Sequence, residues 1–166
     1  VYDKEIELGE IPNDDDKTFA LFRAGDSTGV FQFESAGMKR YMKELKPTEF
    51  SDLVAMNALY RPGPMQEIPR FIEGKNSPAA VQYLHKSLEP ILRDTYGVMV
   101  YQEQIIQLLQ LVAGYSAGEA DLVRKAIGKK KRDIMQAEEP KFVKGCVKQG
   151  LTESQASRLI SLDIVS

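Results

Sequence analysis

The amino-acid sequence predicts a mainly α-helical fold with one or two short strands. Apolar residues recur every three to four positions through most of the chain, which is the period of an α-helix with one buried face. Residues that favour helix starts, such as Ser116 and Thr152, stand before several of these stretches. Strand-like alternation is confined to two four-residue stretches, 30–33 and 98–101, and the second equally fits the entry to a helix.

The first 64 residues contain signals for three helices. Residues 1–13 are expected to form an extended lead-in, after which Asn13 and three aspartates begin a helix, because side-chain oxygens here accept hydrogen bonds from the first turn. Three adjacent aspartates also suggest a metal site, but neighbours on one helical turn point in different directions, so capping is the preferred interpretation. The elements that follow are a turn (23–29), a short strand (30–33), an amphipathic helix (34–45), a buried helix (47–60) and a Pro-Gly-Pro turn (61–64).

The rest of the chain is expected to pack around one central helix, 102–113. Six Ile, Leu and Val residues cover more than half of its circumference, so it should lie in the core. Gln102 and Gln104 fall inside this apolar sector and need hydrogen-bond partners, for which a neighbouring loop is preferred over a ligand. The other elements are a short helix (68–72), a surface loop (74–80) and a weakly helical segment interrupted by Pro90 (83–92). Three further helices are expected at 118–127, 135–149 and 152–160.

The stretch from Gly118 to Arg132 is the strongest functional candidate. Leu122, Val123, Ala126 and Ile127 form one apolar stripe, and Asp121, Arg124, Lys125 and Gly128 fall on the opposite side of the helix. Six cations and no anion lie between Arg124 and Arg132. A cationic helix face that continues into a basic loop is typical of a site for polyphosphate or a nucleic-acid backbone. The alternative is a solvated helix face followed by a flexible loop.

Composition restricts the function classes. The 166 residues carry a net charge of −2, so the positive charge is local rather than a property of the whole chain. One cysteine and one histidine exclude an internal disulfide framework, fit a reducing compartment and leave almost no ligands for zinc. No apolar run approaches the roughly 20 residues of a membrane span. The first residues include neither an initiator methionine nor a signal peptide, so we expect a piece of a larger, cytoplasmic protein.

Four longer motifs occur in order along the chain, at 28–35, 58–64, 95–104 and 118–131. They read TGVFQFES, ALYRPGP, TYGVMVYQEQ and GEADLVRKAIGKKK. In this order they resemble the bacterial C-family replicative DNA polymerases, the alpha subunits of DNA polymerase III, over about residues 8–160. The sequence shows no phosphate-cradling glycine loop, nucleophile elbow or Cys–His pairing, so the residues alone predict a helical domain that binds phosphates without a catalytic centre of its own.

The resemblance implies a fold and a division of labour. Residues 1–13 would be a lead-in following a palm domain that is absent here, and residues 14–166 a partial, helical fingers domain. The family's catalytic aspartates, which hold two Mg²⁺ ions, lie in the palm, and none maps onto this sequence, so no catalytic or metal-binding residue is expected and the chain alone should be inactive. At the other end, Ser-Leu-Asp-Ile-Val-Ser replaces an aromatic, glycine-rich continuation in relatives, so we expect incomplete fingers.

The resemblance also implies roles for the cations. Arg124 matches an arginine that contacts the triphosphate of the incoming dNTP, and Lys125 stands where relatives often carry a second arginine, which keeps the charge but not the bidentate fork. Arg61, beside a rigid turn, either contacts a ligand or caps carbonyls at a helix end. The lysine run 129–131 fits either the same triphosphate or nearby template backbone. We assign nucleotide binding to Arg124, Lys125 and Lys129, and DNA binding to Lys130, Lys131, Arg132 and Arg61.

The preferred hypothesis is a fragment of a DNA-directed DNA polymerase, a nucleotidyltransferase of DNA replication. Its partners would be primer–template DNA, dNTP, and the sliding clamp and clamp loader of the holoenzyme through regions not present here. The alternative from another class is a stand-alone helical nucleic-acid-binding module without catalysis. A third hypothesis is a degenerate remnant that folds but has no activity.

Overall fold

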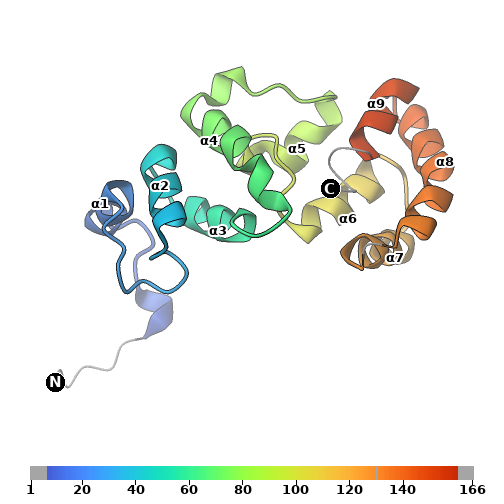
Figure 1. The fold of residues 1–166 in the computed structure, drawn as a ribbon. Helices are drawn as coiled ribbons and strands as arrows, with labels where there is room; N and C mark the ends of the chain where they lie inside the picture. Colours follow the sequence, from blue (N-terminus) through green and yellow to red (C-terminus); the bar gives the residue numbers. More distant parts are fainter. Residues whose placement is uncertain (1–6, 130, 161–166) are drawn as a thin grey trace. The chain divides into compact units, whose positions relative to one another are not determined.

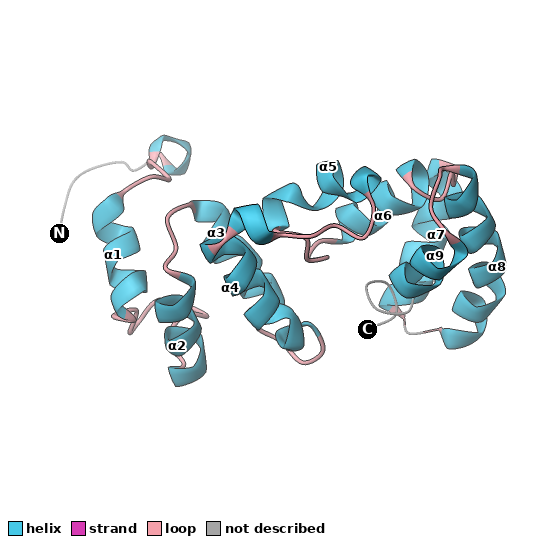
Figure 2. Ribbon diagram, turned by 90° about the horizontal axis from the view of Figure 1, so that it is seen from above, coloured by secondary structure: helices cyan, strands magenta, loops and turns pink. Residues whose placement is uncertain are grey.

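The computed structural model describes residues 7–129 and 131–160, and the regular elements in this part of the chain are all helical (Figures 1 and 2). The chain divides into two compact units, Val1–Tyr60 and Arg61–Ser166. The predicted helical class is confirmed. The predicted short strands are wrong, because neither 30–33 nor 98–101 forms one. Within the described residues, no helix has the length and apolar character needed to cross a lipid bilayer.

Within residues 7–60, the first unit contains three α-helices and a short 3₁₀ helix. The 3₁₀ helix spans Leu8–Glu10, and the α-helices are α1 (Asp16–Ala24), α2 (Ala36–Leu45) and α3 (Phe50–Leu59). The acidic run before α1 caps the helix as predicted, since the Asp15 carboxylate accepts a hydrogen bond from the Thr18 N–H at 2.8 Å. Helices α1 and α2 pack through buried Phe19, Phe22, Met38, Met42 and Leu45.

The segment 30–33 is a tight turn, and its local bonds explain why the strand prediction fails. Gly29 and Gln32 both have positive φ angles, 83° and 66°, which reverse the chain direction. The Ser27 hydroxyl donates to the Phe33 carbonyl at 2.7 Å, so the turn is closed from inside. Four residues of alternating polarity contain too little information to distinguish such a turn from a strand.

Six more α-helices lie in the described residues of the second unit, 61–129 and 131–160. They are α4 (Ile68–Asn76), α5 (Glu89–Leu92), α6 (Gln102–Leu111), α7 (Ala117–Gly128), α8 (Arg132–Lys148) and α9 (Glu153–Leu159). Short 3₁₀ helices lie at Pro64–Glu67, Pro78–Ala80, Lys86–Leu88 and Arg93–Thr95. Two sequence expectations change here: α4 runs past the predicted loop start at Gly74, and Pro90 stands in the first turn of α5, where its missing N–H does no harm, rather than interrupting a helix.

The core of the second unit forms where α6 packs on α7, α7 on α8 and α8 on α9 (Figure 1). Leu108, Leu109 and Val112 are buried in it, which confirms α6 as a core helix. The apolar sector is narrower than predicted, because Leu111 is 63% exposed. Residues 98–101 lead into α6: the Val100 and Tyr101 N–H groups donate to the side-chain oxygen of Gln104 at 2.8 and 2.9 Å.

Candidate functional site

Helix α7 carries the candidate site, and its sequence explains why the helix begins where it does. The Ser116 hydroxyl accepts a hydrogen bond from the Glu119 N–H, and the Glu119 carboxylate accepts one from the Ser116 N–H at 2.9 Å. This reciprocal capping box satisfies two N–H groups that the first helical turn leaves unpaired. The predicted cap at Ser116 is therefore confirmed.

The buried face of α7 determines which side chains reach solvent. Ala120, Val123 and Ala126 are buried, whereas Leu122 is 68% exposed, so the predicted stripe is displaced around the helix. Small side chains on the inner face allow α7 to approach its neighbours closely. The face that carries Arg124 and Lys125 remains outside the core.

Asp121 brings Arg124 and Lys125 together. Its Oδ1 accepts hydrogen bonds from Nε and Nη2 of Arg124 at 3.0 and 2.9 Å, and its Oδ2 lies 2.7 Å from Nζ of Lys125. These bonds, first from Lys125 and then from Arg124, lower the pKa of the Asp121 carboxyl, so it is ionised at neutral pH. One carboxylate thus stands opposite two cations, and the group of three keeps one net positive charge.

Arg124 also has a partner on another helix. Its Nη1 donates to Oε1 of Gln102, the first residue of α6, at 2.7 Å. The expectation that Gln102 lies in the apolar sector is wrong, since its side chain is exposed. Gln104 does behave as predicted: it is 6% exposed and its amide donates to the Ile91 carbonyl and the Thr95 hydroxyl, which fastens the preceding segment to α6.

The remaining basic residues of the predicted site follow α7. Lys129 caps its C-terminal end, and its N–H donates to the Lys125 carbonyl at 3.1 Å. Lys131 precedes α8, and both lysines are exposed. Lys130 lies outside the described residues, and Arg132 is the first residue of α8, with its side chain outside the described part of the chain.

Arg61 is exposed at the start of the Pro-Gly-Pro turn. Its carbonyl accepts a hydrogen bond from the Met65 N–H at 3.2 Å. Within residues 7–129 and 131–160 its guanidinium has no hydrogen bond or ion pair, so the alternative of an arginine that caps carbonyls receives no support from the described contacts.

A second polar network links α7 to α8, and no pattern in the sequence predicts it. Lys141 lies 2.8 Å from the Glu119 carboxylate and 4.3 Å from the centroid of the Tyr115 ring, whose hydroxyl donates to Glu138. The bonds from Lys141 and then Ser116 lower the pKa of Glu119 to about 2. Burial, followed by the bond to Glu138, raises the pKa of Tyr115. Lys141 is therefore occupied by packing and charge partners within the fold.

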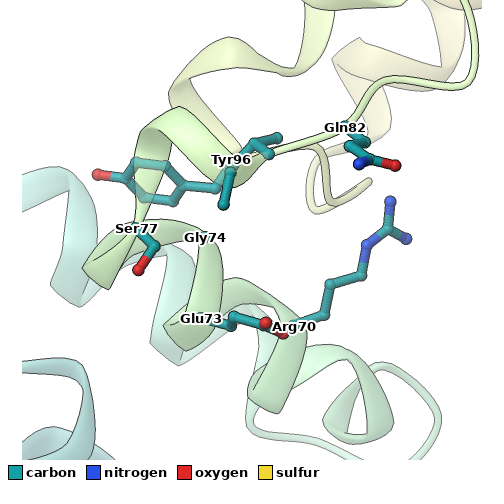
Figure 3. Close-up of a pocket in the computed structure, with 8 residues that line it drawn as sticks. Arg70, Glu73, Gly74, Ser77, Gln82 and Tyr96 are labelled. Carbon is teal, nitrogen blue, oxygen red and sulfur yellow. The ribbon is translucent and has the colours of Figure 1, made fainter.

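A polar pocket of about 250 Å³ lies between α4 and the segment around Tyr96 (Figure 3). Arg70, Glu73, Ser77 and Gln82 contribute side chains to its wall, and Arg70 Nη2 donates to the Gly97 carbonyl at 2.9 Å. None of the residues predicted to bind nucleotide or DNA lines this pocket. The cationic residues of α7 thus lie outside this pocket.

The described residues do not fit a magnesium site. Nowhere in that part of the chain do three or more Asp, Glu, His or Cys side chains converge as metal ligands would. Hard cations such as Mg²⁺ need several oxygen ligands, and Asp15 already accepts from the first turn of α1.

Comparisons with known proteins agree on one family. The family model described as the bacterial DNA polymerase III alpha subunit finger domain matches residues 1–150. DNA polymerase III subunit alpha of Halalkalibacterium halodurans is 51% identical over 161 residues, which is 97% of this chain and 14% of that protein. The Bacillus subtilis subunit is 51% identical over 158 residues, 95% of this chain and 14% of that protein. The Staphylococcus aureus subunit is 47% identical over 157 residues, which is 95% of this chain and 15% of that protein.

The chain thus spans about one seventh of the length of the relatives it matches. A match of this length and identity shows common descent as well as common fold. The chain belongs to the family of bacterial DNA polymerase III alpha subunits, within which it corresponds to the finger domain.

Proposed function

We propose that this chain acts within a replicative DNA-directed DNA polymerase and that α7 contacts the triphosphate of the incoming dNTP. The observation that carries the proposal is the pairing of Arg124 and Lys125 with one carboxylate, at 2.7 to 3.0 Å. Because Arg124 and Lys125 both bond to the Asp121 carboxylate, their spacing is also suited to two oxygens of a phosphate group. Arginine binds such oxygens with a planar fork of N–H donors. Lys129 follows one turn later and adds to the same field.

The DNA contacts are assigned to the basic residues that follow α7 in the sequence and to Arg61. Lys130 and Lys131 come between α7 and α8 in the sequence, Arg132 is the first residue of α8, and Arg61 presents an exposed guanidinium without a described partner. Lysine and arginine bind the phosphate backbone through charge and release its counterions, largely irrespective of base sequence. We propose that these four residues hold primer–template DNA.

The chemical role of α7 is electrostatic. When a primer 3′-hydroxyl attacks the α-phosphate of a dNTP, negative charge builds on the β- and γ-phosphates that leave. Fixed cations beside those phosphates stabilise that charge in the transition state more than in the ground state. Arg124, Lys125 and Lys129 supply such cations.

Magnesium enters only through the family. The described residues offer no cluster of ligands that would hold this ion. We propose that the ions, the primer hydroxyl and the contacts to the clamp and clamp loader belong to other regions of the full-length subunit. The purified chain by itself should then give no primer extension with magnesium, primer–template and dNTP, and extension that scales with its concentration would overturn this.

The test of the nucleotide assignment is Arg124→Ala in the full-length subunit that contains this segment. Loss of charge-assisted bonds worth about 1.5–3 kcal/mol should lower kcat/KM for dNTP roughly ten- to a hundredfold. DNA affinity should change little, because many other cations hold the backbone. Arg124→Lys should recover only part of the loss, since lysine keeps the charge but not the fork.

The matched control is Arg93→Ala. Arg93, directly after α5, also pairs with a carboxylate near in the sequence, that of Glu89 in α5, at 3.1 Å, but it lies outside the basic stretch. This variant should keep normal dNTP kinetics. An Arg124→Ala enzyme with normal dNTP kinetics and weakened DNA binding would place α7 on the DNA and refute the nucleotide assignment.

A further inference from the structure

Gln102 makes one hydrogen bond that its position in the helix does not explain. Its side chain is exposed at the first residue of α6, so it is not there to fill the core. The start of α6 is already capped by Gln104, which accepts from the Val100 and Tyr101 N–H groups. Within the described residues, the partner of the Gln102 side chain is Arg124, 22 positions later in the sequence.

The Arg124 guanidinium has five N–H groups that can donate hydrogen bonds. Asp121 takes one on Nε and one on Nη2, and Gln102 takes one on Nη1. One N–H on each Nη nitrogen is left for a ligand. Because the two acceptors stand on different helices, the guanidinium cannot rotate or swing away without breaking at least one of these bonds.

We infer that Gln102 is a positioning residue for triphosphate binding, which holds the Arg124 guanidinium in its binding orientation before the nucleotide arrives. This inference rests on the proposed role of Arg124 as a phosphate ligand. The side chain of Arg124 is only 22% exposed, as expected of an arginine held from two sides.

The chemical type of the acceptor supports this assignment. Asp121 already cancels one of the two positive charges of Arg124 and Lys125. A second carboxylate at position 102 would cancel the other and leave a neutral group with little attraction for phosphate. An amide oxygen orients the guanidinium without removing charge, so glutamine is an acceptor suited to a polyanionic ligand.

The size of the effect follows from side-chain entropy. Immobilising a long side chain on binding weakens affinity by roughly two- to tenfold, and a side chain that is already fixed avoids that loss. Gln102→Met keeps a similar length and volume but removes the acceptor. In the full-length subunit it should raise KM for dNTP about three- to tenfold with little change in kcat, because the bond acts on ground state and transition state alike.

The experiment is a double-mutant cycle that combines Gln102→Met with Arg124→Ala, with steady-state dNTP kinetics as the readout. Gln107→Met, on an exposed glutamine of the same helix, is the control and should leave KM unchanged. If Gln102 acts through Arg124, its substitution raises KM in the wild-type background but not in the Arg124→Ala background.

Two results would overturn the inference while the proposed function stands. In one, Arg124→Ala lowers kcat/KM for dNTP but Gln102→Met leaves KM unchanged; in the other, Gln102→Met raises KM equally in both backgrounds. If Arg124→Ala itself leaves kcat/KM for dNTP unchanged, the proposed function fails and the inference fails with it. The three results are distinguishable in one set of four enzymes.

Discussion

Replacing Gly145 with alanine would place a methyl group against the main chain of Ala113, where α8 packs beside the end of α6. A Cβ built at Gly145 lies 1.9 Å from the Ala113 carbonyl oxygen and 2.9 Å from its carbonyl carbon. Real Cβ atoms essentially never approach another heavy atom closer than 3.0 Å, so the shortfall is at least 1.1 Å (3.0 Å less 1.9 Å). The obstructing atom belongs to the backbone and cannot rotate away, so α8 must move.

The free energy of unfolding should fall by about 2 kcal/mol. Overpacking of this kind costs about 1–3 kcal/mol, and the backbone clash argues for the upper end. A shift of about 1 Å also weakens the contacts of neighbouring Phe142 and Cys146, which are 1% and 0% exposed. Against this, alanine is favoured over glycine within a helix by about 1 kcal/mol. The clash therefore outweighs the helix preference.

The assay is urea denaturation of the purified chain, followed by circular dichroism. With an m-value of about 2 kcal/mol/M, the midpoint for Gly145→Ala should fall by about 1 M. Gly118→Ala is the matched control, since Gly118 also lies in a helix but has nothing within 4 Å of its built Cβ. It should gain up to about 1 kcal/mol. A Gly145→Ala chain as stable as the Gly118→Ala chain would refute the close packing of α8 against Ala113.

Three further predictions concern single side chains of the second unit. Leu109 is 1% exposed, so Leu109→Ala should lower the free energy of unfolding by about 2–5 kcal/mol in the same urea assay. Leu122→Ala, at an exposed position, should change that free energy by less than about 0.5 kcal/mol. Equal losses for the two variants would contradict the assigned core. Burial raises the pKa of the Cys146 thiol to about 11, so iodoacetamide should label it slowly in the folded chain and quickly in urea, as followed by mass spectrometry, and equal rates would place the thiol at the surface. Hydrogen bonds from Lys141 and then Ser116 lower the pKa of Glu119 from 4.5 to about 2, so its ion pair stabilises the fold above pH 4.5 and is lost as the pH falls towards 2. Glu119→Gln should therefore lose less stability than wild type between neutral pH and about pH 3 in urea melts. Parallel pH profiles of the two proteins would show that this ion pair contributes nothing to stability.

The helix boundaries were largely predictable because they depend on neighbours in sequence. The acidic run at 13–16, Ser116 and Thr152 are each predicted to begin a helix. In the structure the side chains of Asp15, Ser116 and Thr152 each accept a hydrogen bond from an N–H three residues later. Such a bond is made by local geometry and needs no contact from elsewhere in the fold. The strand prediction at 30–33 is wrong for the opposite reason. A strand needs hydrogen bonds to a partner strand, and a four-residue stretch does not reveal whether such a partner exists.

The exposed and buried faces were predicted less well. Leu111 and Leu122 belong to apolar stripes in the sequence, yet both are exposed, while Ala120, outside the predicted stripe, is buried. Val123 and Ala126 are buried as predicted. Periodicity identifies a helix with an apolar side, but the neighbouring helices determine which part of that side is covered. The packing of Gly145 on Ala113 was likewise invisible in the sequence, because the two residues approach only when α8 lies on the end of α6.

The sequence by itself determined the helical class, the main helix starts, the family and the cationic face of α7. Four ordered motifs identified the DNA polymerase III alpha subunits, which the comparisons confirm, and the spacing of Asp121, Arg124 and Lys125 placed them on one face. Only the tertiary structure decided that Gln102 reaches Arg124. Helical spacing specifies neighbours three and four positions apart, whereas a contact across 22 positions exists only once two helices pack.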